Sequence, residues 1–135
     1  MDSSVWVAAA DSADSLCAAS RAFFSSVVRH GSPIHVPAFA RVEIGCALAR
    51  RNRDAAAGRR LAHAMLGGAQ VVEVATDAAL LARALRAGTA AFLRGADSLF
   101  AATAAATGAP LVSWDDEMIR RGGAVTPSDW MAAHP

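Results

Sequence analysis

Four acidic residues are the side chains of this chain best suited to chemistry: Asp2, Glu43, Asp97 and Asp115. Asp115 directly follows the apolar segment PLVSW, and Asp97 lies at the start of the helical segment that leads into it. Carboxylates gathered in one place repel one another, so their pKa values rise unless a cation neutralises them. Ligand sets made only of oxygen favour Mg²⁺ or Mn²⁺ over zinc. The four acids are therefore candidates for a divalent-metal site.

Each acid also has an ordinary structural interpretation. Asp97 is a candidate N-cap for the helix SLFAATAAATG, and Asp115 and Asp116 are candidate caps for the short helix that follows them. Glu43 is also compatible with a solvated helix position, and Asp2 with a terminal residue that has no fixed partner. Spacing alone does not join the four acids into one site, so the elements that carry them must be considered.

Strands and helices are expected to alternate along the chain. This alternation predicts one α/β domain with a mainly parallel central sheet flanked by helices. In such sheets, ligands bind beyond the carboxyl ends of the strands, which is where Asp115 falls. The expected strands are 34–37, 69–75, 110–114 and 124–127, and the main helices are expected after Asp11 or Asp14 and over 38–54, 55–68, 78–88 and 98–108, with a shorter helix around Phe92 and Leu93.

Composition and charge narrow the class of protein. The chain is 54% hydrophobic and 19% charged, as in a globular domain, and its net charge of +1 gives no global field for nucleic acid. No apolar run is long enough to span a bilayer, and VWVAAA lacks the basic leader of a signal peptide. Cys17 and Cys46 lie in Ala-rich helical patterns and are expected to be reduced core residues. The expected location is cytoplasmic.

The basic residues are all arginine, and this excludes some alternatives. Receiver domains and haloacid-dehalogenase-like phosphatases also gather acids at strand ends, but they need a lysine to pair with the phosphoryl group. The chain contains no lysine, which argues strongly against both classes. The four histidines lie in unrelated contexts and are not expected to be catalytic.

Three motifs in order resemble the PIN domain: DSSVWVAA near the start, FARVEIGCALAR in the middle and RGADSLFAATAAATGAPLVSWDDEM near the end. The resemblance covers almost the whole chain, including VTPSDW, and is nearest to the VapC-like toxins of bacterial toxin–antitoxin pairs. It implies a ribonuclease that depends on Mg²⁺ or Mn²⁺. It also implies an RNA substrate, a small antitoxin protein as partner and a homodimer, without a membrane.

The resemblance also assigns roles to individual residues. It implies that the catalytic residues are Asp2, Glu43, Asp97 and Asp115. The three aspartates would bind metal, while Glu43 would act through water or orient the attacking water. The implied supporting residues are Ser4, Ser113 and Asp116, with Glu117 as a further helper, and the candidate RNA contacts are Arg120 and Arg121.

The chain departs from the family pattern at its beginning. PIN proteins carry several apolar residues ahead of the first acid, whereas only Met1 precedes Asp2 here. We therefore expect a PIN-like domain over residues 1–135 whose N-terminal strand is truncated. The alternative function is a catalytically inactive PIN-like binding module.

Overall fold

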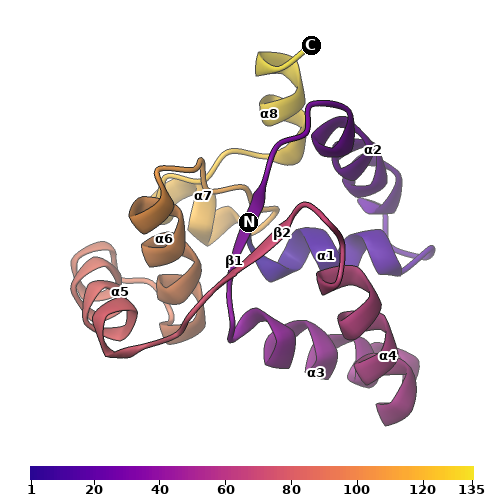
Figure 1. The fold of residues 1–135 in the computed structure, drawn as a ribbon, viewed down its shortest axis with the longest axis horizontal. Helices are drawn as coiled ribbons and strands as arrows, with labels where there is room; N and C mark the ends of the chain where they lie inside the picture. The colour runs from indigo at the N-terminus through magenta and orange to yellow at the C-terminus, as the bar shows by residue number, and fades with distance from the viewer.

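The computed structural model describes residues 1–135 as helices around a small parallel sheet (Figure 1). The expected single α/β domain is confirmed. The elements in chain order are α1 (Ser3–Ala10), α2 (Cys17–Arg29), β1 (Ile34–Pro37), α3 (Ala40–Asn52), α4 (Ala55–Leu66), β2 (Val71–Val74), α5 (Ala78–Ala91), α6 (Gly95–Thr107), α7 (Asp116–Gly122) and α8 (Pro127–Ala133).

The sheet is smaller than the sequence predicts. β1 and β2 pair in parallel, with Ile34 opposite Val71. The expected strands 110–114 and 124–127 are reduced to one parallel bridge between Val112 and Val125. Pro110 and Pro127 lie beside these two segments, and proline cannot donate a ladder hydrogen bond, so the pairing does not extend.

The first two residues connect β1 with the segment around Val112. The Met1 nitrogen donates to the His35 carbonyl (2.9 Å), and the Asp2 amide donates to the Val112 carbonyl (2.9 Å). Helix α1 begins directly afterwards, at Ser3. The backbone of residues 1 and 2 therefore lies between β1 and 111–113 and fixes where α1 starts.

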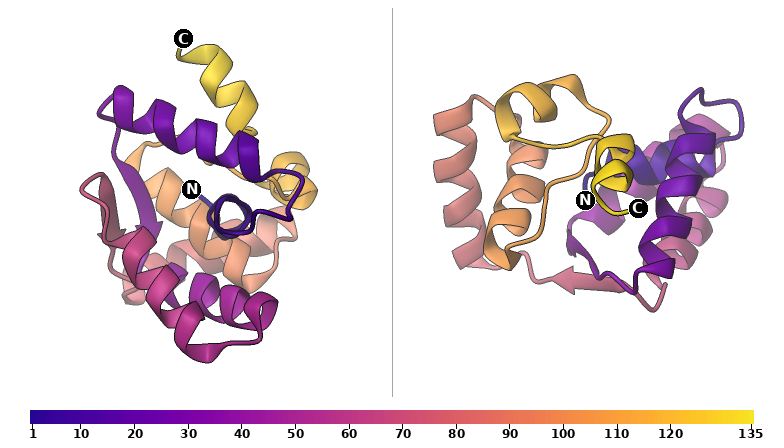
Figure 2. Two further views of the ribbon diagram at one scale, coloured as in Figure 1. Left: turned by 90° about the vertical axis from the view of Figure 1, so that its right-hand side faces the viewer. Right: turned by 90° about the horizontal axis from the view of Figure 1, so that it is seen from above.

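The helices surround this framework in contacting pairs. α3 contacts α4, α5 contacts α6, and α8 contacts α2, while α6 covers β1 and touches α7. α1 lies between α2 and α3, as the end-on view in Figure 2 shows. The main core joins most of these elements; its largest fully buried side chains include Val5, Val36, Ile44, Leu48, Phe100 and Met118.

Two helix pairs depend on glycine for their close approach. A Cβ on Gly88 of α5 would lie 2.0 Å from Ser98 Oγ of α6, and a Cβ on Gly58 of α4 would lie 2.6 Å from the Ala49 Cβ of α3. A larger residue at either position would force the helices apart. The Gly88–Ser98 contact lies in the first turn of α6, next to Asp97, so it fixes the position of that residue relative to α5.

Several expectations at single residues are wrong. Cys46 is exposed rather than part of the core, whereas Cys17 is buried as expected; both thiols are free. Phe92 is not helical; it ends α5 in the left-handed conformation (φ 56°). Asp97 is not an N-cap, because Gly95 and Ala96 are already helical. No helix has the length and apolar composition needed to cross a membrane.

Candidate functional site

Asp2 is a buried carboxylate whose two oxygens are well supplied with donors. It is the N-cap of α1, and its Oδ1 accepts from the Ser3 amide at 2.7 Å. Its Oδ2 accepts from the Ser4 hydroxyl (2.7 Å) and the Ser113 hydroxyl (2.6 Å), and more weakly from the Ser4 amide (3.4 Å). The start of a helix favours a negative charge at this position. Asp2 is buried, with only 3% of its surface exposed, and these hydrogen bonds fix the position of its carboxylate.

Ser113 connects two of the candidate acids. Its fully buried hydroxyl donates to Asp2 Oδ2 and accepts from the Asp115 amide at 2.9 Å. Ser4 makes a parallel connection, since its hydroxyl accepts from the Trp114 amide at 3.0 Å. These bonds tie the start of α1 to the segment that ends at Asp115, and both Ser4 and Ser113 contact the Asp2 carboxylate.

Asp97 is buried with fewer partners. It lies in the first turn of α6 with 8% of its surface exposed, and its Oδ2 is buried without a hydrogen-bond partner. Burial and the neighbouring charge of Asp2 raise the pKa of Asp97 to about 6, while Arg94 opposes the shift. A buried carboxylate without hydrogen-bond donors destabilises the fold, and such groups are typical of functional sites.

Glu43, in the first turn of α3, has a similar environment to Asp97. Its Oε2 is buried without a partner. Burial, followed by the charges of Asp2 and Asp97, raises the pKa of Glu43 to about 7, and a hydrogen bond with Ser3 counteracts this in part. Three acids from α1, α3 and α6 are therefore close enough to influence one another electrostatically.

Asp115 has two roles on its two oxygens. Its Oδ1 caps α7 by accepting from the amides of Glu117 (2.7 Å) and Met118 (3.3 Å), which confirms the structural interpretation. Its Oδ2 faces the Arg94 guanidinium at 3.7 Å. Asp116, in contrast, is exposed, and Glu117 is the residue of α7 that turns toward the other acids.

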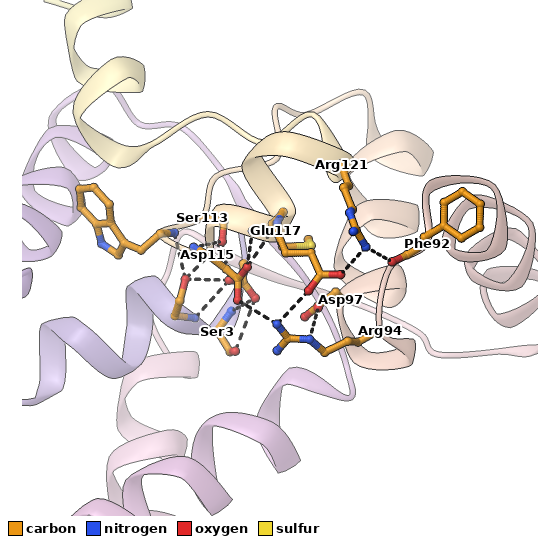
Figure 3. A network of polar contacts seen from close by, with 12 residues as sticks. Ser3, Phe92, Arg94, Asp97, Ser113, Asp115, Glu117 and Arg121 are labelled. Atoms are coloured by element: carbon orange, nitrogen blue, oxygen red, sulfur yellow. Dashed lines mark hydrogen bonds and ion pairs between the residues drawn. The ribbon is translucent and has the colours of Figure 1, made fainter.

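The Arg94 guanidinium lies among three of these carboxylates (Figure 3). Its Nη2 is 2.9 Å from Glu117 Oε2 and 3.7 Å from Asp115 Oδ2, and its Nε is 3.8 Å from Asp97 Oδ2. Sequence reasoning missed this residue. The available signal was an arginine three positions before an aspartate at a helix start, a spacing that brings side chains together.

The profile of the PIN domain family matches residues 1–124. The chain belongs to this family. PIN domains are typically metal-dependent nucleases. No curated protein and no solved structure matches the chain significantly.

The oxygens of this PIN domain fit a hard divalent cation, although they are not assembled around one. No three His, Cys, Asp or Glu side chains are arranged to hold a metal ion as the structure stands. Asp97 Oδ2 and Glu43 Oε2 are nevertheless buried acceptors that lack a donor. Mg²⁺ or Mn²⁺ would supply a partner for Asp97 Oδ2, and a water bound to the ion could supply one for Glu43 Oε2; carboxylate ligands suit these ions.

The two arginines of α7 differ in the contacts that their side chains make. Arg120 is exposed and forms no ion pair, whereas Arg121 donates to the Phe92 carbonyl (3.0 Å) and to Glu117 Oε1 (3.1 Å). Both follow Asp115 by one to two helical turns. Arg120 is therefore the more available of the two candidate RNA contacts in this PIN domain.

Proposed function

We propose that this PIN domain is a metal-dependent endoribonuclease that hydrolyses RNA phosphodiester bonds, and that it is the toxin of a VapBC-type toxin–antitoxin pair. The observation that carries the proposal is the buried Asp97 Oδ2, which has no hydrogen-bond donor and lies near the negative charges of Asp2, Asp115 and Glu117. The membership in a nuclease family and the order of the motifs support the same reading.

Asp2, Asp97 and Asp115 are the residues that would hold Mg²⁺ or Mn²⁺. When bound, such an ion offsets the negative charge of a phosphodiester and lowers the pKa of a coordinated water. The chain itself contributes orientation. Ser4 and Ser113 fix the Asp2 carboxylate, and the capping bonds of Asp115 Oδ1 leave its Oδ2 to face the other acids.

Glu43 is suited to accept a proton from the attacking water. Its Oε2 is buried without a partner, and its pKa of about 7 lies near the pH at which a general base works best. We assign it to accept the proton of the attacking water, or to orient that water. The histidines have no place in this scheme.

The proposed partners are RNA, a small antitoxin protein and a second copy of the chain. Arg120, with Arg121 beside it, would contact RNA phosphates next to the acids. Light scattering of the purified chain tests for the homodimer.

The deciding experiment is cleavage of mixed tRNA and ribosomal RNA with Mg²⁺, Mn²⁺ or EDTA. The parent chain is expected to cut with metal and to stop with EDTA. Asp97→Asn is expected to lose at least about a hundredfold in rate, since it removes a metal ligand. Asp77→Asn is the matched control, because Asp77 is an N-cap on α5 outside this group of acids. No cleavage by the parent under any condition would contradict the proposal.

The alternative is a PIN-like binding module without activity. The observation in its favour is the Arg94 guanidinium, which already neutralises part of the acidic group. Binding of RNA that is unaffected by EDTA and by Asp97→Asn, without any cleavage, would favour this module over the nuclease.

A further inference from the structure

Arg94 is placed where it competes with the proposed metal. Its guanidinium carries one positive charge and reaches oxygens of Asp97, Asp115 and Glu117, two of which are assigned to metal binding above. Both Asp97 Oδ2 and Asp115 Oδ2 face this guanidinium at 3.7 to 3.8 Å, beyond hydrogen-bond distance. The charge of Arg94 is near these two oxygens, but it does not satisfy them.

The backbone holds Arg94 at the edge of the acids, while its side chain remains free to leave. Arg94 is the N-cap residue of α6, and its carbonyl accepts from the Ser98 amide (2.9 Å) and the Ser98 hydroxyl (2.8 Å). Ser98 in turn lies against Gly88 of α5. The Arg94 side chain, however, is 66% exposed, so it can swing into solvent without disturbing the fold.

We propose that Arg94 is a built-in counter-cation of the acidic site, which a divalent metal must displace in order to bind Asp97 and Asp115. This inference rests on the proposed function and goes beyond it. Before metal binds, the domain's own arginine offsets part of the negative charge of the acids. The exchange is favourable because a divalent ion meets the carboxylate oxygens directly, whereas the guanidinium makes only one short contact, with Glu117.

Removing the charge of Arg94 should therefore strengthen metal binding. Titration of Mn²⁺ into the apo chain at pH 8, followed by the loss of the free-ion resonance signal, measures the Kd. Arg94→Gln is expected to bind Mn²⁺ roughly threefold to tenfold more tightly than the parent, since one exposed positive charge near the site is removed. The charge-matched control is Arg86→Gln on α5, an exposed arginine with no ion pair, which should change the Kd less than about twofold.

A second measurement follows the displacement itself. The side-chain Nε–H resonance of Arg94, assigned by its absence in Arg94→Gln, should shift with Mg²⁺ along the same curve as metal binding. The shift should disappear in Asp97→Asn.

The outcomes separate this inference from the proposed function. If the parent binds Mn²⁺ and Arg94→Gln binds it equally or more weakly, the counter-cation is refuted while the metal site stands. An Arg94 resonance that stays unchanged at saturating Mg²⁺ would refute it as well. If neither the parent nor Arg94→Gln binds Mn²⁺, both the metal site and the role of Arg94 fall.

Discussion

Asp2 and Asp97 are two buried carboxylates of one site with opposite surroundings. Asp2 accepts from two hydroxyls and from the amides that open α1. Asp97 has an oxygen that is buried without any donor. A buried carboxylate that is fully hydrogen-bonded is part of the framework, whereas one left short of donors destabilises the fold and points to a ligand. Asp2 is therefore a proposed metal ligand that the fold already holds in place, whereas Asp97 is a proposed ligand whose buried oxygen has no partner in the chain.

The difference between Asp2 and Asp97 is tested most directly by removing each carboxylate in turn. Asp2→Ala is expected to lower the free energy of unfolding by about 3 kcal/mol, because it removes a helix cap and leaves the buried Ser113 hydroxyl and the half-buried Ser4 hydroxyl without their acceptor. Asp97→Ala is expected to cost less than about 1 kcal/mol at pH 7, because a destabilising charge leaves with the side chain. Urea unfolding of both variants measures the two values. Equal losses would show that the two environments do not differ in energy.

A smaller loss of stability is expected when Ser113 is changed, the residue that links Asp2 to Asp115. Ser113→Ala should lower the free energy of unfolding by about 2 kcal/mol, since Asp2 loses a charge-assisted donor and the Asp115 amide loses its acceptor. Thr89→Ala is the control, because Thr89 is an exposed helix residue whose hydroxyl bonds only to backbone carbonyls of its own helix. A stability for Ser113→Ala equal to that of the parent would remove Ser113 from the framework.

The pH dependence of stability tests the region that binds. The folded-state pKa values of about 6 for Asp97 and about 7 for Glu43 lie above the reference values of 3.8 and 4.5. In the native state these two acids therefore hold more protons than in the unfolded state, so they make stability fall as pH rises from about 4 to about 7. The buried Met1 ammonium acts in the opposite direction above about pH 6, because burial lowers its pKa from 8.0 to about 6. Below that pH the two acids dominate, and after allowance for solvent screening the apo chain should be about 1–2 kcal/mol less stable at about pH 6 than at about pH 4.5.

Glu43→Gln should remove a large part of that pH dependence. Glu73→Gln should leave it intact, because Glu73 is a surface residue paired with Arg41. Chemical unfolding of the metal-free chains at about pH 4.5 and about pH 6 gives the comparison. A parent that is equally stable at both pH values would contradict the raised pKa values of Asp97 and Glu43.

The smallest effect concerns the neighbouring acids on α7. Asp116 is exposed and forms no hydrogen bond or ion pair, whereas Glu117 contacts Arg94. Asp116→Asn is expected to change the free energy of unfolding by less than about 0.5 kcal/mol and to leave Mn²⁺ affinity unchanged. A large loss of Mn²⁺ affinity would restore Asp116 to the supporting role that the sequence predicts.

The sequence predicts well what depends on local chemistry. β1 is predicted at its true bounds from its branched residues, and Asp115 is predicted as a cap because a carboxylate before a short helix can accept from the free amides of its first turn. The position of Asp97 is predicted less well. Its helix starts at Gly95, three residues earlier than expected, because a glycine followed by an N-cap type residue favours a later start on local preference alone.

Long-range pairings are the part that sequence reasoning could not provide. The Ser113–Asp2 bond and the Trp114–Ser20 bond (2.8 Å) join residues with no pattern in common. The position of Arg94 was missed for a related reason. An arginine at a helix start looks like any solvated charge until α7 brings Asp115 and Glu117 to it.

The bond between Ser113 and Asp2 has a consequence for the order of folding. It closes a loop of 111 residues, for which the entropic cost is about 4 kcal/mol. Such a contact is not formed until the intervening chain has collapsed around it. The Asp2 amide, bonded to the Val112 carbonyl, should therefore exchange its hydrogen only through global unfolding. A partly folded chain would lack the complete acidic site, so the proposed chemistry arises only when folding is complete.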